Sequence, residues 1–406
     1  MADRRDDVIG EGKADVVEEH IDRTYRHNSR YHASLMGWSD KQSHILTAGG
    51  VSSELYQAPR FPFSAEELPH FHKSRGTTHE AFAAWRRQGT ELGTAIAGAW
   101  RRPLFVGGWT HSDDVSHDGE TTFNLQTPSL FIDMRVPRAG SALLGHHRGF
   151  ETMTDLELRL FARRHAFAGF TRVEPINGRG GRGEGGGLMA TRHHSIDWNY
   201  VGEPRARPNK WRVEMGPGGD TWREWGFAKD AFDQHVYMER WQRLPAGGGP
   251  FLALRRRPAA SSPRKPDALL VVCGDHFGLI VDRRPPDVLL GKEKGGDSRV
   301  GGVVGVVDAA IARGDRRQAV EFMSLEASHG RVSGATGYLP WTVDCSLHPW
   351  LQGRRPFCGT VLTVAPDRLS VTLAGRRFRG QDGDNNSVWT GVPLDGVWDV
   401  VESTLS

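Results

Sequence analysis

The sequence predicts a mostly β protein made of two sequential antiparallel β-barrels that follow a partly helical N-terminal extension. Three observations favour this fold class. The 406 residues include 50 glycines and 13 tryptophans, short apolar or alternating runs are separated by Gly, Asp and Pro, and a Pro- and Ser-rich stretch lies past the middle. Glycine permits tight turns, and large aromatic side chains fill barrel interiors. The length is enough for two or three hydrophobic cores.

The extension spans residues 1–97 and differs in pattern from the rest of the chain. Charged stretches at residues 16–25 and 79–100 predict helices, and the segment between them is irregular and rich in His, Pro and Ser. We expect the extension to pack on or cap the barrels and its first ten residues to be disordered.

The first barrel is expected within residues 98–257. One helix, residues 155–166, interrupts it, with Thr154 and Glu157 as a capping box and Leu156, Leu160 and Phe161 as its apolar face. The predicted strands are residues 130–136, 170–174, 188–200, 211–215, 221–226, 235–244 and 251–256.

Residues 258–267 form a Pro- and Ser-rich linker to a second barrel within residues 268–406. A short helix is predicted at residues 303–313. The predicted strands are residues 269–273, 277–282, 319–327, 341–345, 359–364, 369–373 and 397–401.

Composition excludes several classes of protein. The 52 Lys and Arg against 49 Asp and Glu leave a net charge of +3 that is scattered along the chain, so nucleic-acid binding gains no support. No apolar run is long enough for a membrane span, and the N-terminus does not resemble a secretory signal, so we expect a cytoplasmic protein. Three cysteines without CxxC spacing predict neither a disulfide framework nor a zinc knuckle, and Cys273 reads as a buried inert thiol.

Strand parity nominates the candidate site, because alternate side chains of a strand lie on opposite faces. In residues 188–200 one parity is polar and includes His193 and Asp197, while Trp198 belongs to the other. A half-buried strand with its polar face in water explains this pattern. The alternative is that His193 and Asp197 line the barrel mouth, where the carboxylate orients the imidazole.

Neighbouring strands favour a pocket. His235, Tyr237, Glu239 and Trp241 share one parity, and this mixture of aromatic and ionisable groups suits a binding site. Asp133 and Arg135 also share a face, as a closed ion pair or as an anchor for an anionic ligand. Arg212 and Glu214 alternate in the same way, and they too could form a closed ion pair or an anchor for an anionic ligand.

Other motifs are weaker. Asp275 and His276 lie at a turn and could line a rim. His70, His72, His79 and Glu80 have metal-ligand spacing but fall in the irregular extension, and surface histidines explain them better, so we expect no metal. The Gly-rich residues 177–187 predict a hairpin loop, and no G-x-S-x-G elbow indicates a serine hydrolase.

Residues 100–356 resemble a family of largely uncharacterised bacterial proteins related to fungal paired-barrel proteins of lipocalin-like form. The resemblance rests, in order, on residues 125–135, 167–171, His193 with residues 196–198, and on residues 237–241, 274–277, 330–331 and 346–350. This chain departs from the family pattern at Leu347, His348 and Gln352. The resemblance implies a lipocalin-like barrel fold but no settled activity.

Three functions remain open. The first is binding of an apolar or amphipathic small molecule in a barrel lumen, with Trp198 or Trp241 stacking on it and Asp133, Arg135, Arg212, His235, Tyr237 and His276 among the binding residues. The second is a cofactor-independent isomerase, cyclase, hydratase or lyase in which His193 or Glu239, with Asp197, moves a proton. Such barrels elsewhere host cyclisation and hydration, which is an analogy of fold. The third is an interaction protein with a packed interior.

Overall fold

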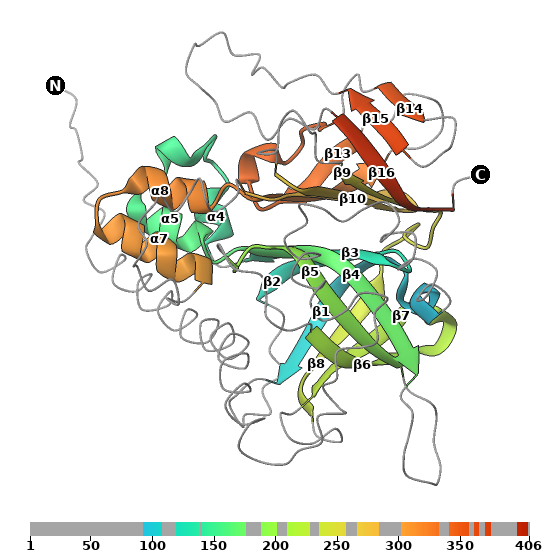
Figure 1. The fold of residues 1–406 in the computed structure, drawn as a ribbon. Coiled ribbons are helices and arrows are strands. Elements are labelled where there is room, and N and C mark those ends of the chain that lie inside the picture. The colour runs from blue at the N-terminus through green and yellow to red at the C-terminus, as the bar shows by residue number, and fades with distance from the viewer. Residues whose placement is uncertain are drawn as a thin grey trace, which may run out of the picture.

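The computed structural model describes residues 92–107, 119–138, 140–175, 188–200, 209–227, 235–256, 266–283, 302–332, 341–356, 361–364, 370–374 and 396–404. The fold is mostly β. A closed eight-stranded antiparallel barrel packs against a second eight-stranded sheet, and a small layer of helices lies beside both (Figure 1). None of the described helices is long and apolar enough to cross a membrane.

The barrel follows chain order, each strand pairing with the next, and it closes where Trp100 of the first strand lies opposite Arg243 of the last. A short 3-10 helix, η2 (Thr94–Ile96), leads into it. Its strands are β1 (Gly98–Gly107), β2 (Glu120–Gln126), β3 (Leu130–Pro137), β4 (His165–Pro175), β5 (Leu188–Asp197), β6 (Asn209–Met215), β7 (Thr221–Phe227) and β8 (His235–Arg243). The 3-10 turn η4 (Pro217–Gly219) joins β6 to β7.

The second half forms an open sheet instead of the expected second closed barrel. Its order is β13-β12-β11-β10-β9-β16-β15-β14, and the end strands β13 and β14 do not pair with each other in the described part of the chain. The strands are β9 (Phe251–Arg256), β10 (Ala268–Cys273), β11 (His276–Val281), β12 (Glu326–Val332), β13 (Trp341–Ser346), β14 (Val361–Val364), β15 (Ser370–Ala374) and β16 (Gly396–Ser403).

The boundary between the two halves therefore differs from the predicted one. Residues 251–256, expected in the first barrel, form β9, which pairs with β10 and β16 of the second sheet. The chain passes between the halves at residues 244–250. The Pro- and Ser-rich stretch instead joins two neighbouring strands of one sheet, and most of it lies outside the described residues.

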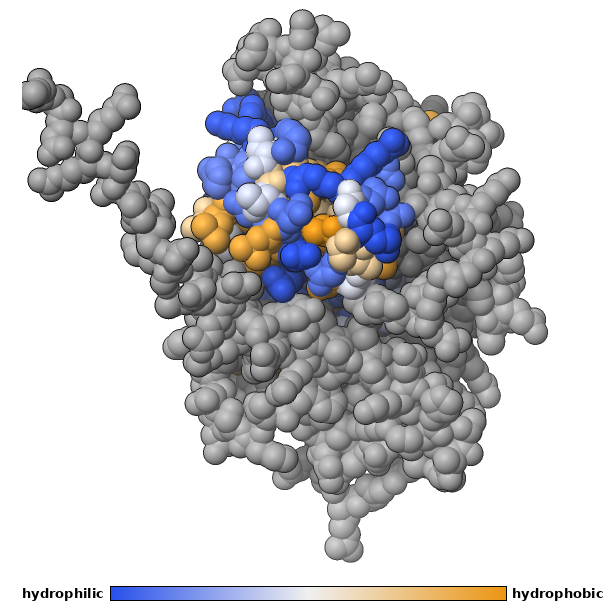
Figure 2. All heavy atoms as spheres, turned by 90° about the vertical axis from the view of Figure 1, so that its left-hand side faces the viewer, coloured by the Kyte–Doolittle hydropathy of each residue, from blue (hydrophilic) through white to orange (hydrophobic). Residues whose placement is uncertain are grey.

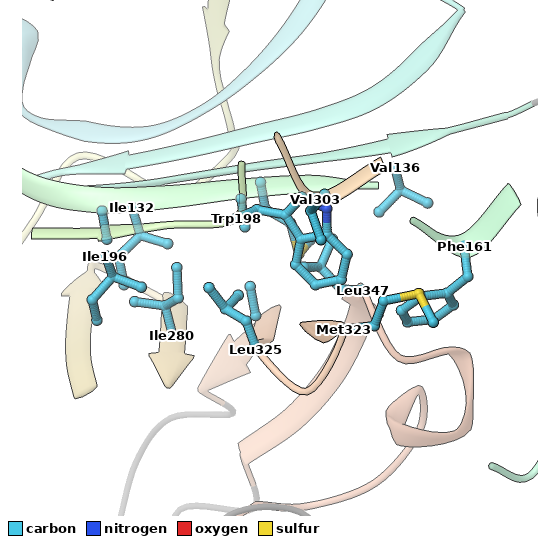
Figure 3. Close-up of a cluster of buried hydrophobic side chains, with 14 of the residues drawn as sticks. Ile132, Val136, Phe161, Ile196, Trp198, Ile280, Val303, Met323, Leu325 and Leu347 are labelled. Carbon is cyan, nitrogen blue, oxygen red and sulfur yellow. The ribbon is translucent and has the colours of Figure 1, made fainter. Parts of the chain in front are cut away.

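The core between the halves comes from one wall of the barrel. Ile132 of β3 and Ile196 of β5 point toward Ile280 of β11 and Leu325 (Figure 3). Gly278 lies at a close approach of the two sheets, since a Cβ there would stand 3.3 Å from Leu125 Cδ1. Strand β3 is buried on both faces because this core covers one of them and the barrel interior covers the other.

The helical layer consists of α4 (Ser141–Leu144), η3 (Phe150–Thr152), α5 (Asp155–Phe161), α7 (Gly302–Ala312) and α8 (Arg316–Phe322). The capping box predicted for α5 is present, with Thr154 accepting from Glu157 N and Glu157 accepting from Thr154 N. The helix ends earlier than expected, because β4 already begins at His165. Leu156 is 45% exposed and does not join the buried face, and Figure 2 shows apolar and charged side chains mixed on this side of the molecule.

Two of the element predictions were wrong, and the helix prediction in the second half was confirmed. Of residues 319–327, expected as a strand, residues 319–322 belong to helix α8, whose Ala319 and Phe322 share a buried face one turn apart, and only residues 326–327 are strand, at the start of β12. The helix expected for residues 79–100 overlaps β1, which begins at Gly98, and residues 79–91 lie outside the described chain. The helix predicted at residues 303–313 is α7.

Candidate functional site

The interior of the β1–β8 barrel, called the lumen below, is defined by strand register. Residues directly opposite one another in an antiparallel pair lie on the same face of the sheet. Trp100 pairs with Asn124, Asn124 with Asp133, and Asp133 with Phe167 across the first four strands. On the far side Trp222 pairs with Trp241 and Glu224 with Glu239. These side chains are all buried and point into the lumen.

One end of the lumen is apolar and is called the tryptophan end. Trp222 stacks on Trp241 with ring centroids 5.5 Å apart, and Trp100 meets Trp222 edge to face at 6.1 Å. Trp100 Nε1 donates to Ile96 O, which holds the entry segment η2 across this end. The buried cluster here is Ile96, Trp100, Val173, Ala190, Trp211, Val213, Trp222 and Trp241.

The other end, the charged end, is held by arginines that bridge carboxylates on different strands. Arg102 Nη1 donates to Glu239 Oε1 at 2.6 Å, and its Nη2 donates to Glu120 Oε2 at 2.9 Å. Arg135 holds Asp133 through Nε at 2.8 Å and contacts Glu239 Oε1 at 3.3 Å. Burial alone would raise the pKa of Asp133, but the arginines outweigh it and keep that pKa below its usual value.

Arg192 of β5 connects the two ends. Its Nη1 lies 3.4 Å from Asp133 Oδ2, its Nη2 donates to Gln126 Oε1 at 3.2 Å, and its guanidinium lies 4.2 Å from the centroid of Phe131 and 4.9 Å from that of Trp211. Aromatic faces attract a guanidinium that has lost most of its water. Burial lowers the pKa of Arg192, and the nearby carboxylates, Asp133 first, oppose that shift.

Glu224 and Glu239 form a carboxyl pair with unequal surroundings. Glu239 accepts from two arginines, whereas Glu224 accepts from the Tyr237 hydroxyl at 2.8 Å. Burial, and then the charge on Glu239, raise the pKa of Glu224 to about 8. Glu224 is therefore a neutral acid at pH 7, and it lies beside the carboxyl group of Glu239, which accepts from two arginines. Two carboxyl groups in such unequal surroundings are the arrangement that acid and base catalysis uses.

An imidazole and carboxylate pair lies in the barrel wall, but it is His194 and not the expected His193 that meets Asp197. His194 Nδ1 lies 2.5 Å from Asp197 Oδ2, and its ring stacks on Phe167 at 4.4 Å. Burial would raise the pKa of Asp197, but His165 and His194 hold it well below its usual value.

A β-bulge explains the correction at His193. The register of β4 against β5 shifts so that Ala168 opposes Ile196 while Gly169 opposes His194, which leaves Ser195 as the extra residue. A Cβ at Gly169 would stand 1.9 Å from His193 O, so only glycine permits this close approach. The extra residue reverses the alternation, and Asp197 lies with His194 while His193 lies on the opposite face.

The other expected site residues divide into two groups. Asp133, Arg135, Tyr237, Glu239 and Trp241 share the lumen, as strand parity predicted. Three residues lie elsewhere: Trp198 packs in the core between the sheets and donates to Ala162 O, Arg212 lies on the outer face of β6, and His276 lies in β11 and contacts Pro245 O. The side chain of His235 and residues His70, His72, His79 and Glu80 lie outside what the structure describes.

Sequence reasoning missed several polar lumen residues, among them Arg102, Asn124, Arg192, His194 and Glu224. Arg102 was overlooked because no strand was predicted between residue 100 and residue 130. The other four needed the pairing partners of each strand, which parity within one strand does not give. Glu224 alternates with Trp222 within β7, a signal that could have been used.

Several buried polar atoms of the lumen have no hydrogen-bond partner among the described residues. Asn124 is fully buried and neither atom of its amide is paired. The unpaired lumen atoms are Thr122 Oγ1, Asn124 Nδ2 and Oδ1, Arg192 Nε, Trp211 Nε1, Trp222 Nε1, Glu239 Oε2 and Trp241 Nε1. Buried polar groups are normally satisfied by protein, water or ligand, so these atoms are open to a further hydrogen-bonding partner.

A separate hollow of about 430 Å³ lies at the turn between β6 and β7. It is lined by Glu214, Met215, Gly216, Pro217, Thr221, Trp222, Arg223, Arg240 and Gln242. It includes neither Glu239 nor Trp241, so it is not the pocket predicted from strand parity.

Comparison with known proteins assigns no family. No family model matches the chain, and no curated protein matches it. The solved structure of an uncharacterised protein from Saccharomyces cerevisiae aligns with a TM-score of 0.36 and 13% identity, over 76% of this chain and 100% of that one. Likeness at this level carries no functional inference, so the lumen is interpreted from its own geometry.

Proposed function

We propose that the barrel binds one small amphipathic molecule in its lumen. The observation that carries this proposal is the set of unpaired buried polar atoms that line it, Asn124 foremost. An isolated buried amide without a partner is unfavourable by roughly 1–3 kcal/mol, so a chain that keeps such groups gains by offering them to a guest. Eight-stranded barrels have interiors that side chains fill or that hold one small ligand, which fits this role.

The two ends of the lumen give the guest a direction. Its apolar part lies against Trp222 and Trp241, whose rings offer flat apolar surface and indole N–H donors. Its polar part meets Asn124 and Arg192 between the two ends. Arg192 already lies between Phe131 and Trp211, so it can pair with an acidic group without moving into water.

The test uses 1-anilinonaphthalene-8-sulfonate, an amphipathic dye with an apolar ring system and one anionic group. We expect one equivalent to bind the full chain with quenching of tryptophan emission, and Asn124→Leu and Arg192→Met to weaken binding at least tenfold. Arg223→Met, on the exposed outer face of β7, is the matched control and should leave binding unchanged. Equal affinity in all four proteins would contradict lumen binding and favour an interaction protein with a packed interior.

A second candidate is a cofactor-independent isomerase, cyclase, hydratase or lyase on the same scaffold. The observation in its favour is the pair of Glu224, neutral at pH 7, and Glu239, which lies beside it and accepts from two arginines. In this proposal Glu239 removes a proton from the guest and Glu224 supplies one. The role first considered for His193 is dropped because that side chain lies outside the lumen.

Proton transfer can be tested without knowing the reaction. A molecule that copurifies with the protein is identified by native mass spectrometry, extracted and incubated with the protein in D₂O. An enzyme of this kind incorporates deuterium into the molecule, and Glu239→Gln should slow incorporation by about 10² or more. Glu214→Gln, on the outer face of β6, is the control. Absence of incorporation alongside tight binding would leave the carrier function and remove the enzyme.

We further propose a lipocalin-like barrel and a cytoplasmic location. The chain-order pairing of the eight strands supports the first. The second rests on the sequence and agrees with two buried thiols, Cys273 and Cys345, that are not bonded to each other.

A further inference from the structure

We infer that His146, His147 and Glu157 form a binding site for a divalent transition-metal ion of the zinc class. The three residues lie outside the barrel, in the connection between β3 and β4 and in helix α5. Each offers one ligand atom, and these atoms all lie within 4.8 Å of one another. Two imidazoles and a carboxylate are the donor set that Zn²⁺ accepts in sites with an open fourth position.

The hydrogen bonds of His147 fix which ring nitrogen is available. Thr152 Oγ1 donates to Gly149 O at 3.1 Å, and a hydroxyl has only one hydrogen to donate. At the 2.8 Å contact with His147 Nδ1, Thr152 Oγ1 must therefore accept, so Nδ1 carries a hydrogen. In the neutral ring, Nε2 then has the lone pair. Metal-binding histidines are commonly oriented in this way by a partner on their other nitrogen.

Nε2 of His147 faces a carboxylate oxygen but lacks an aligned partner. Glu157 Oε1 is 3.0 Å away, yet this buried nitrogen has no hydrogen bond of good geometry among the described residues. A lone pair beside an anionic oxygen is repulsive unless a cation lies between them. With metal bonds of about 2.0–2.1 Å, neighbouring ligand atoms lie roughly 3.3 Å apart, close to this distance.

The Oε2 atom of Glu157 holds the carboxylate in an orientation that suits a metal ligand. Oε2 accepts from Thr154 N at 2.7 Å and Thr154 Oγ1 at 2.8 Å, which fixes the carboxylate and leaves Oε1 turned to His147. The third ligand, His146, is exposed and its ring lies beside that of His147, with ring centroids 4.0 Å apart and an angle of 36° between the ring planes, so the ring can rotate onto the ion.

This site was not foreseen from the sequence. Adjacent histidines followed by a glutamate in a later helix have no metal-motif spacing, and only the fold of residues 140–161 brings them together.

Titration of the full chain with Zn²⁺, and with Co²⁺ for its visible absorption, tests the inference. We expect one tight equivalent with the spectrum of a four- or five-coordinate site, and His146→Ala and Glu157→Gln to weaken it at least tenfold. Glutamine still accepts from Thr154 N, so Glu157→Gln keeps the helix cap. Glu321→Gln in α8 is the matched control, and its affinity should equal that of the parent chain.

A second variant tests the positioning of His147. Thr152→Val keeps the shape of an exposed residue and removes the hydroxyl, so we expect affinity to fall about 10- to 100-fold while the metal-free protein unfolds at its usual temperature. If the parent chain, His146→Ala and Glu157→Gln bind the metal equally, or none binds it tightly, a proton and not an ion lies between His147 and Glu157 and the inference is wrong.

Discussion

The most quantitative prediction concerns His329, which the structure holds neutral in the core between barrel and sheet. Its ring stacks on Phe123 of β2 at 4.0 Å and faces His276 at 5.4 Å, and neither ring nitrogen has a partner among the described residues. Burial, followed by His276 and Arg331, lowers the pKa of His329 from 6.5 to about 3. A charged imidazole here would be buried without an ion-pair partner among the described residues.

The magnitude follows from linkage. Because the folded pKa lies below the unfolded one, the contribution of His329 to stability is present above pH 6.5 and is lost as pH falls toward 3. With those two pKa values, lowering the pH from 7 to 5 reduces the free energy of unfolding by about 2 kcal/mol. For an m-value of about 3 kcal/mol/M, this loss lowers the urea concentration at the unfolding midpoint by about 0.7 M.

The assay is urea unfolding followed by tryptophan fluorescence at pH 7 and pH 5. His329→Phe removes the titrating group and keeps a flat ring against Phe123. Between pH 7 and pH 5 we therefore expect the variant to lose about 2 kcal/mol less free energy of unfolding than the parent chain loses. His329→Gln provides a second comparison if the phenylalanine does not fit. His146→Phe, at an exposed site, should behave as the parent does. An equal loss in His329→Phe and the parent would refute the neutral, buried state of this imidazole.

The remaining predictions address the lumen, the sheet contact and the helix cap. Since the pKa of Glu224 is raised from 4.5 to about 8, its stabilising effect is present below pH 4.5 and lost toward pH 8, so Glu224→Gln should flatten the decline of unfolding free energy between pH 5 and pH 8. Gly278→Val should destabilise the chain by about 1–3 kcal/mol in urea melts, because the side chain would press on Leu125, and an unchanged midpoint would contradict the close packing of the sheets. Thr154→Ala should lower stability by about 1 kcal/mol by removing the cap of α5, whereas Thr154→Ser should not.

Strand parity predicted the lumen residues where strands are regular. Asp133 with Arg135, and Tyr237 with Glu239 and Trp241, lie in regular stretches, so period-two alternation places them correctly.

The prediction failed at His193 because one bulged residue reverses every later assignment on its strand. The residues around the bulge in β5 carry no sequence signal for it. The one related residue is Gly169, which belongs to β4 and contacts the bulge only in the folded chain.

The two-barrel prediction failed for a different reason. The number of strands was nearly right, but closure depends on whether the first and last strands of a half meet, and this is a long-range property. β9 follows the eighth barrel strand after a short turn, yet it pairs with β10 and β16. A continuous apolar run predicts a strand that is buried on both faces, but it does not predict to which sheet the strand belongs.

The wall formed by β2 to β5 has a consequence for how this chain can change. Ile132 and Asp133 are neighbours in sequence, but the first belongs to the contact between the sheets and the second to the lumen. A substitution that adjusts the fit of the two halves therefore shifts the backbone that also carries the lumen arginines and carboxylates. Selectivity for a guest and resistance to unfolding are thus linked through the same four strands, and improving one will tend to alter the other.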